Sequence, residues 1–179
     1  HATKVKEQWQ RWSNGPFSNK EGSVAPLLTS VWNQSNPYNI YCPYNNTYSE
    51  RTVTGCVATA MAQIMRYWHW PDVGYGIHIY NWPPYGNLGA DFGSTYYNWD
   101  MMPDTLKPTC SSLEKDAVAS LMYHAGVAVN MMYGPSSAGG SAAYSYSAGS
   151  FDFACAENAY KTYFRYNPLL VSRYKNAYS

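Results

Sequence analysis

The chain has 179 residues, of which 46 % are hydrophobic, and this is enough apolar content for one folded domain with its own core. The formal net charge is only +1, which gives no electrostatic reason to expect nucleic acid or an anionic membrane as a partner. No stretch approaches the roughly 20 apolar residues of a membrane-spanning helix. Charged residues make up 13 % of the chain and aromatic residues 17 %, a balance that is common in extracellular proteins.

Residues 1–22 form a polar stretch that Asn14-Gly15-Pro16 interrupts. We interpret this stretch as an amino-terminal extension or the remnant of a removed propeptide, and we expect the main domain to occupy residues 23–179. Residues 24–32 predict a short apolar element, helical despite Pro26. Residues 36–53, rich in Asn, Tyr and Pro, predict a loop.

Residues 54–68 predict the helix around which the domain is organised. Thr54 is placed to cap it, and Pro71 ends the pattern because proline disfavours helix in the residue before it. Small residues at Ala58, Ala60 and Ala62 allow close approach of neighbouring elements, so we expect this helix to be buried. Its apolar side chains recur at spacings of three and four: Val57, Ala60, Met61, Ile64, Met65 and Trp68.

Cys56 falls in the first turn of this predicted helix. Unpaired backbone N–H groups and the positive end of the helix dipole favour a thiolate there, so the sulfur is a candidate nucleophile near neutral pH. A free cysteine is more often a small buried hydrophobic residue, so this position alone does not decide its role.

Gln34 lies 22 positions before Cys56, in a polar segment that predicts a loop. Attack of a thiolate on a peptide carbonyl creates an oxyanion, and a glutamine side chain can donate a hydrogen bond to it. Gln34 is therefore the candidate oxyanion donor. Taken alone, it would equally suit a surface loop.

The remaining elements follow in order. Residues 75–82 predict part of a hairpin, and a long loop rich in Gly, Pro and Asn then extends to Asp100. Ser111 and Glu114 form a capping box for a helix that extends to about Ala125. Residues 127–133 alternate as a strand, residues from Ser150 or Asp152 to about Tyr163 predict another helix, and residues 164–166 a short strand.

Four segments, in this order, resemble the streptopain-like cysteine peptidases, papain-like enzymes secreted by bacteria, and among them the interpain- and periodontain-type members. The segments are Asn33 to Asn39, Thr54 to Ala60 with Gln63-Ile64-Met65, Tyr97-Asn98-Trp99, and Met132 to Ser137. The resemblance implies an α+β, papain-like fold, represented here mainly by its helical, nucleophile-bearing half with little sheet.

The resemblance also implies a site. Cys56 would be the nucleophile and Gln34 the oxyanion donor of an endopeptidase that needs no cofactor and acts on protein or peptide substrates. A hydrophobic residue two positions before the scissile bond would be favoured. We expect the export of this protein, to the medium, the periplasm or the cell surface of a bacterium. The residues implied at the wall that receives the substrate side chain are Tyr133, Gly134, Ser136, Ser137, Ala138 and Gly139.

A papain-type mechanism also needs a histidine, which in such chains lies roughly 130 to 150 residues after the cysteine. Counted from Cys56, this places it at about residue 186 or beyond. We therefore expect the catalytic histidine, together with the barrel-like half of the fold, after Ser179 or on a second chain of the same precursor. An inhibitory propeptide is a further expected partner. His78 and His124 are weaker substitutes, since a lone histidine is rarely catalytic.

Other functions fit the sequence less well. An inactive homologue that binds peptide or another protein without cleaving it has little reason to retain both the helix-terminal thiol and the oxyanion glutamine. An aromatic-rich extracellular module that binds peptide or carbohydrate explains the composition but leaves the order of the four segments unexplained. No histidine pair or cysteine cluster has metal-binding spacing, so we expect no metal site. Cys42, Cys110 and Cys155 allow one disulfide or none.

Overall fold

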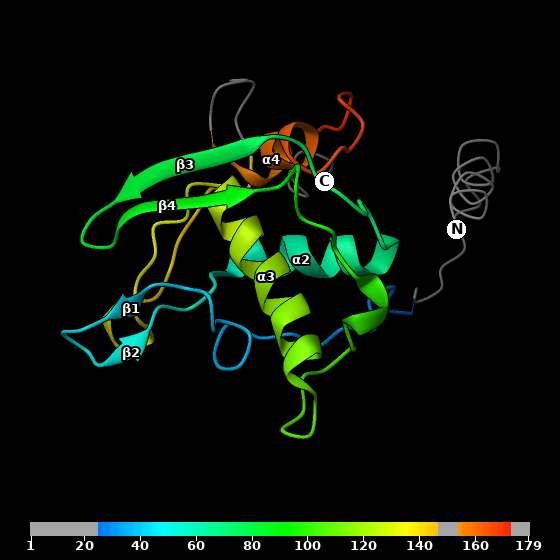
Figure 1. Cartoon of the computed structure of the whole chain (residues 1–179). Coiled ribbons are helices and arrows are strands. Elements are labelled where there is room, and N and C mark those ends of the chain that lie inside the picture. Colours follow the sequence, from blue (N-terminus) through cyan, green and yellow to red (C-terminus); the bar gives the residue numbers. More distant parts are fainter. Residues whose placement is uncertain (1–24, 147–153, 173–179) are drawn as a thin grey trace, which may run out of the picture.

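The computed structural model describes residues 25–146 and 154–172. Two helices, α2 (Cys56–Trp68) and α3 (Ser112–Ala128), cross and pack against each other at its centre (Figure 1). An antiparallel hairpin of β3 (Ile77–Trp82) and β4 (Gly86–Asp91) covers the C-terminal end of α3. The described part is therefore mainly helical, with little sheet.

Smaller elements surround this centre. A second antiparallel pair, β1 (Tyr44–Asn45) and β2 (Glu50–Arg51), lies below the larger hairpin in the view of Figure 1. The 3-10 turn η1 (Trp99–Met101) packs on α3, and α4 (Ala156–Thr162) contacts both α2 and α3. A second 3-10 turn, η2 (Ser136–Ala138), stands close to the two short strands.

The helix predicted for residues 54–68 is confirmed as α2, Cys56–Trp68, but the side it buries differs from the prediction. Ala60 and Ile64 were expected inside and are exposed. α2 meets α3 through small residues and flexible methionines, because these let the two backbones approach closely and fill the remaining gaps. The buried residues of α2 are Ala58, Thr59, Met61, Ala62 and Met65.

The capping box at the start of α3 is confirmed. The Glu114 N–H donates to Ser111 Oγ (3.2 Å), and the Ser111 N–H donates to Glu114 Oε2 (2.7 Å). The helix ends at Ala128 rather than near Ala125. The strand predicted for residues 127–133 is wrong, because Val127 and Ala128 continue α3 into the core and Asn130, at φ 50°, then turns the chain.

Four other predictions need correction. Residues 25–32 form no helix; their backbone is held by long-range bonds such as that from the Val31 N–H to the Asp104 carbonyl (2.9 Å). The predicted loops at 36–53 and after Trp82 contain β1, β2 and β4, and residues 164–166 form no strand. α4 begins at Ala156, whereas the predicted start at Ser150 or Asp152 and the domain boundary at residues 22–23 lie outside the described residues.

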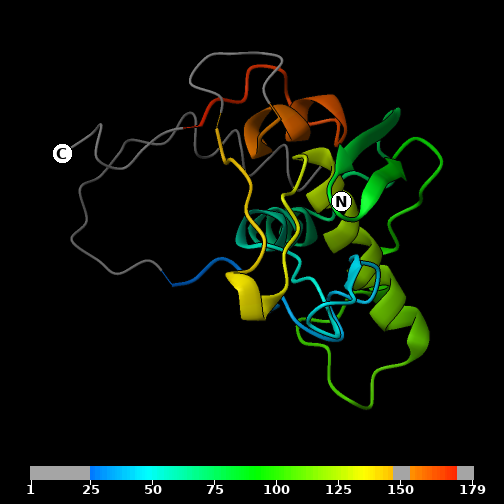
Figure 2. The ribbon, with the colours of Figure 1, turned by 90° about the vertical axis from the view of Figure 1, so that its left-hand side faces the viewer.

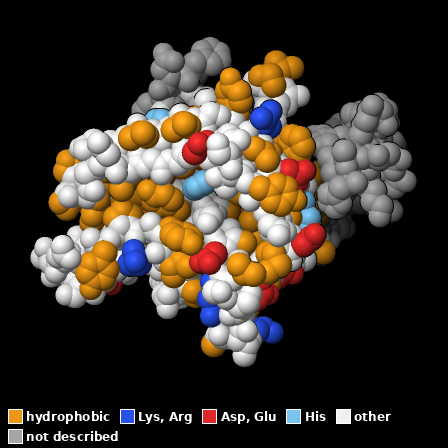
Figure 3. All heavy atoms as spheres, viewed as in Figure 1, with side chains coloured by type: hydrophobic (Ala, Val, Ile, Leu, Met, Phe, Trp, Pro, Cys, Tyr) orange, Lys and Arg blue, Asp and Glu red, His pale blue; other side chains and the backbone are white. Residues whose placement is uncertain are grey.

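The surface carries few charged side chains, as expected from a chain in which only 13 % of the residues are charged. Orange hydrophobic side chains, together with the white backbone and uncharged side chains, dominate the face in Figure 3, with few charged side chains between them. No helix in the described part of the chain has both the length and the apolar character to cross a membrane.

Candidate active site

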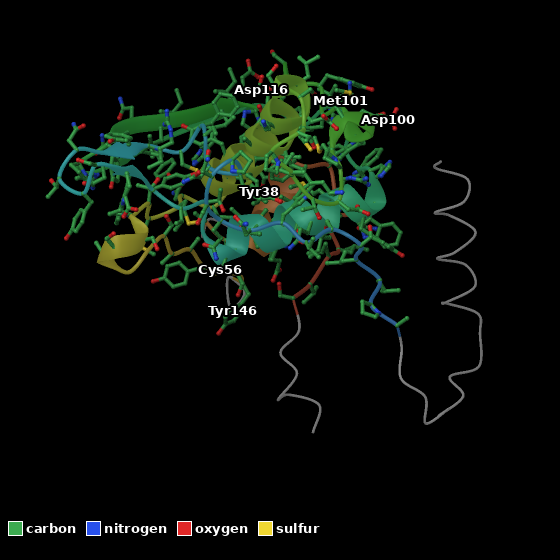
Figure 4. All side chains as sticks on the ribbon, turned by 90° about the horizontal axis from the view of Figure 1, so that it is seen from below. Tyr38, Cys56, Asp100, Met101, Asp116 and Tyr146 are labelled. Carbon is green, nitrogen blue, oxygen red and sulfur yellow. The ribbon has the colours of Figure 1, made fainter. Side chains whose placement is uncertain are left out.

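Cys56 is the first residue of α2, and it is exposed. Its backbone N–H belongs to the helix end at which N–H groups have no partner within the helix. Figure 4 shows Cys56 at the end of α2 that faces η2. The thiol and the start of the helix are thus open to a ligand.

Gly55 fixes the position of the cysteine. Its backbone, at φ 87° and ψ 142°, is in a region that residues with side chains rarely adopt. A Cβ at this position would also lie 2.6 Å from the side chain of Met131. Only glycine fits both constraints, and Gly55 itself forms the N-cap.

The predicted cap at Thr54 is wrong. The Thr54 hydroxyl hydrogen-bonds to the Thr59 hydroxyl (2.9 Å), and Thr59 Oγ1 also donates to the Gly55 carbonyl (3.0 Å). The Thr54 side chain is fully buried, so its hydrogen bond fixes, within the core, the backbone that leads into α2. Its backbone N–H has a different role, because it donates to the Gln34 carbonyl oxygen (3.1 Å).

That bond joins the chain just before Cys56 to the donor loop, by which we mean residues 32–35. The loop is also tied to Gln63 of α2, whose Oε1 accepts from the Trp32 N–H (3.3 Å), and to Pro103, whose carbonyl accepts from Trp32 Nε1 (2.9 Å). Within the described ranges, no residue hydrogen-bonds the side-chain amide of Gln34. The backbone of Gln34 is therefore fixed, and its amide is available for a ligand.

A groove of about 600 Å³ runs beside the donor loop. It brings Gln34 together with Ser136 and Gly139, three of the residues predicted for the site. Cys56 does not line it, although Thr59, one turn further along α2, does. The residues that line the groove are Trp32, Asn33, Gln34, Ser35, Val53, Thr59, Ser136, Gly139 and Gly140.

The far side of the groove is formed by the wall, residues 134–141, which the yellow ribbon of η2 marks in Figure 2. Its tip is residues 136–139, all exposed. Of the other predicted wall residues, Gly134 is half-buried, and a Cβ there would collide with the Gly140 carbonyl oxygen. Tyr133 does not line the groove, because its side chain is buried against Gly126 in α3.

Two residues that hold the wall were missed by the sequence analysis. Ser141 Oγ donates to the Val53 carbonyl (2.6 Å) and accepts from the Gly134 N–H (3.0 Å). Glu50 Oε1 accepts from the Ser137 N–H (3.0 Å). Both are separated from their partners on the neighbouring segment by more than 80 residues, and no local pattern could have indicated them.

The histidines of the described part are engaged elsewhere. His69 lies at the opposite end of α2, about 20 Å from Cys56 by helical rise. His78 hydrogen-bonds to Asn130, and His124 Nδ1 to the Tyr97 hydroxyl (2.9 Å). Burial among aromatic rings lowers the pKa of His124 to about 4, so it is neutral and poorly suited as a base near pH 7.

The other cysteines differ from Cys56 in their surroundings. Cys42 and Cys155 are buried and Cys110 is half-buried, and all four thiols are free. Burial raises the pKa of Cys42 to about 12, which keeps its thiol protonated. Across residues 25–146 and 154–172, no three His, Cys, Asp or Glu side chains form a group that could hold a metal ion.

A second cavity, of about 320 Å³, lies between η1 and α3. Met101 and Asp116 line it, and Figure 4 places both on the other side of the molecule from Cys56. None of the residues predicted for the site belongs to it.

Comparison with known proteins decides the family. Residues 32–179 match the Peptidase C10 family. The chain belongs to this family. Streptopain of Streptococcus pyogenes is 36 % identical over 136 residues, in a match that covers 66 % of this chain and 34 % of streptopain. The thiol protease/hemagglutinin PrtT of Porphyromonas gingivalis is 33 % identical over 129 residues, in a match that covers 66 % of this chain and 15 % of that protein.

Two solved structures have a similar fold over most of this chain. Active wild-type interpain A, a cysteine protease of Prevotella intermedia, superposes with a TM-score of 0.70 at 39 % identity, over 79 % of this chain and 55 % of interpain A. A prointerpain A fragment superposes with a TM-score of 0.67 at 33 % identity, over 89 % of this chain and 50 % of the fragment. The α+β, papain-like fold expected from the sequence is thus confirmed for the matched part. This chain spans about half of those structures and about a third of streptopain.

Proposed function

We propose that this chain carries the nucleophile and the oxyanion donor of a C10 cysteine endopeptidase. A histidine removes the proton from Cys56, and the thiolate attacks the carbonyl carbon of the scissile peptide bond. The oxyanion that forms accepts hydrogen bonds from the Gln34 side-chain amide and the Cys56 N–H. The histidine then returns the proton to the leaving amine, and water hydrolyses the acyl-enzyme.

One observation carries this proposal. The exposed thiol stands at the first position of α2, two residues after the Thr54 N–H that holds the Gln34 backbone. Nucleophile and donor are thereby coupled through a short, rigid stretch of backbone. Such pre-positioning is what lowers the barrier for acyl transfer, because the donors need not reorganise as charge develops.

The base is proposed to come from a segment outside this chain, after Ser179 or on a second chain of the same precursor. The described histidines, His69, His78 and His124, each contact other residues, as set out above. This observation also favours the second candidate, an inactive homologue whose groove binds peptide without cleaving it. Turnover by the full-length natural protein distinguishes the two functions.

The proposal extends to the substrate and to processing. Ser136 and Gly139 line the groove on the side opposite Gln34, where a hydrophobic substrate side chain two positions before the scissile bond would lie. We also propose export of the protein, with residues 1–22 as the remnant of a propeptide. One relative was solved as prointerpain A. Cell fractionation and amino-terminal sequencing of the natural protein test these two points.

Substitution of the nucleophile tests the central assignment. In the full-length natural protein, Cys56→Ala is expected to lower kcat for peptide hydrolysis by about 10³-fold or more, because the residual rate comes only from binding and the oxyanion donors. Cys110→Ala is the matched control, since it removes a half-buried thiol and is expected to leave kcat unchanged. Full activity after Cys56→Ala would refute the assignment.

A further inference from the structure

The wall tip, residues 136–139, has little support from its own segment. Its internal bonds are local: the Ala138 N–H donates to the Pro135 carbonyl (3.0 Å) and the Gly139 N–H to the Ser136 carbonyl (3.3 Å). All four residues are exposed, and η2 buries none of its side chains. Packing therefore contributes little to fixing this tip at the edge of the groove.

A carboxylate on a different element supplies the missing restraint. Glu50 Oε1 accepts from the Ser137 N–H at 3.0 Å. Among the described residues, this is the hydrogen bond that ties residues 136–139 to another element. Neither ion pair in the described part involves Glu50, so its carboxylate contacts the wall tip rather than a Lys or Arg side chain.

Glu50 is itself held firmly. The next residue in β2, Arg51, donates from Nη1 to the Cys42 carbonyl (2.8 Å), and the Thr52 N–H donates to the Pro43 carbonyl (2.8 Å). Asn39 Nδ2 in turn donates to the Thr52 carbonyl (2.9 Å). The short strand β2 is thus anchored to the buried part of the 39–52 segment, and it presents the carboxylate from a fixed base.

We propose that Glu50 is a positioning residue that sets the wall tip, and through it the preference of the groove for the substrate side chain. This inference rests on the proposed function and deepens it. Glu50 does not line the groove, so it acts only through Ser137. A charged acceptor holds a backbone N–H more tightly than a neutral one, because the full charge strengthens the hydrogen bond.

The test compares two alkylating reagents on the full-length natural protein. A peptidyl epoxide with Leu at the position that meets the wall reports on the groove, and iodoacetamide, which is too small to reach the wall, reports on the Cys56 thiol alone. Adducts at Cys56 are counted by mass spectrometry of the cleaved peptide. A wild-type protein whose Cys56 shows no preference for the peptidyl reagent would contradict the proposed function itself, separately from the role of Glu50.

We expect Glu50→Ala to lower the rate constant for the peptidyl epoxide about fivefold, a modest effect because the bond is exposed to solvent, and to leave the rate constant for iodoacetamide unchanged. Glu50→Gln keeps an acceptor oxygen and is expected to recover most of the loss. Glu114→Ala is the matched control: it removes another exposed carboxylate that accepts a backbone N–H, at the start of α3, and should leave both rates unchanged.

Three results would overturn the role of Glu50. The first is wild-type selectivity in Glu50→Ala. The second is equal loss in Glu50→Ala and Glu50→Gln, since the acceptor oxygen would then be irrelevant. The third is a parallel fall in the rate constants for both reagents, because the substitution would then act on the thiol or on the fold rather than on the wall tip.

Discussion

On one side of the groove, the donor loop is tied to Thr54, to Gln63 of α2 and to Pro103 by one hydrogen bond each, and Trp32 within it is buried. On the other side, the exposed wall tip is joined to the rest of the protein by the Glu50 carboxylate. The side that we propose to carry the chemistry is therefore built into the core, whereas the side that we propose to select the substrate is held from outside it. On this proposal, the preference for substrates can change without disturbing the nucleophile.

Of the substitutions that compare the two sides of the groove, the one in the donor loop has the largest expected effect. Gln34→Ala removes the side-chain donor but keeps the carbonyl that accepts from the Thr54 N–H, so the loop should stay in place. We expect kcat to fall by about 10²-fold to 10³-fold with little change in KM, because the oxyanion exists only after attack on the substrate. Steady-state kinetics of the full-length natural protein measure both constants. A change confined to KM would show that Gln34 binds the substrate rather than the oxyanion.

The next largest effect is expected at Gly55, which follows the Thr54 contact with the donor loop and lies against the wall. A Cβ on Gly55 would lie close to Met131 and to Ser141, which belongs to the wall, while its backbone is at φ 87°. We expect Gly55→Ala to lower the free energy of unfolding by about 3 kcal/mol, from backbone strain together with overpacking. Urea unfolding followed by circular dichroism measures this loss.

Gly76→Ala separates the two causes. Gly76 also has a positive φ, 70°, but nothing lies within 4 Å of its Cβ position. Its substitution should cost about 1 kcal/mol, from backbone strain alone. Equal losses at the two glycines would mean that the contact with Met131 does not restrict residue 55.

The smallest effect is a difference in pH dependence between the two sides. The Ser137 N–H holds the pKa of Glu50 below its ordinary value of 4.5. Because the pKa is lowered in the folded protein, the bond is present above the ordinary value and is lost as the pH falls through the lowered one. The backbone N–H of Thr54 donates to a carbonyl, which does not titrate.

We therefore expect the NMR signal of the Ser137 amide to titrate with a midpoint below pH 4.5, while the Thr54 amide shows no titration over the same range. A Ser137 midpoint at or above 4.5, or parallel titration of both amides, would contradict the distinction between the two sides.

The sequence predicted the parts of the site that depend on local patterns. The three-and-four spacing located α2, and the Ser111–Glu114 capping box located the start of α3. It was less successful where distant contacts decide the structure. Val127 has the pattern of a strand residue, yet it continues α3, since packing in the core outweighs the intrinsic β preference of valine.

The same limit applies to the groove. Thr54 has the residue type of an N-cap, but its hydroxyl pairs with Thr59 inside the protein. Glu50 and Ser141 hold the wall through bonds that span 87 and 88 residues, which only the folded chain brings together. Their types, one acid in a predicted loop and one serine in a Gly/Ala/Ser-rich stretch, carried no signal of this role.

The central claim is that the Cys56 sulfur, at the start of α2, reacts with a peptide that is bound in the groove lined by Gln34. Treatment of the full-length natural protein with one equivalent of a leucine-containing peptidyl epoxide, followed by peptide mapping, tests it most directly. We predict a single adduct on Cys56, and none after Cys56→Ala. An adduct on Cys110 or on another residue, with Cys56 unmodified, would contradict the account.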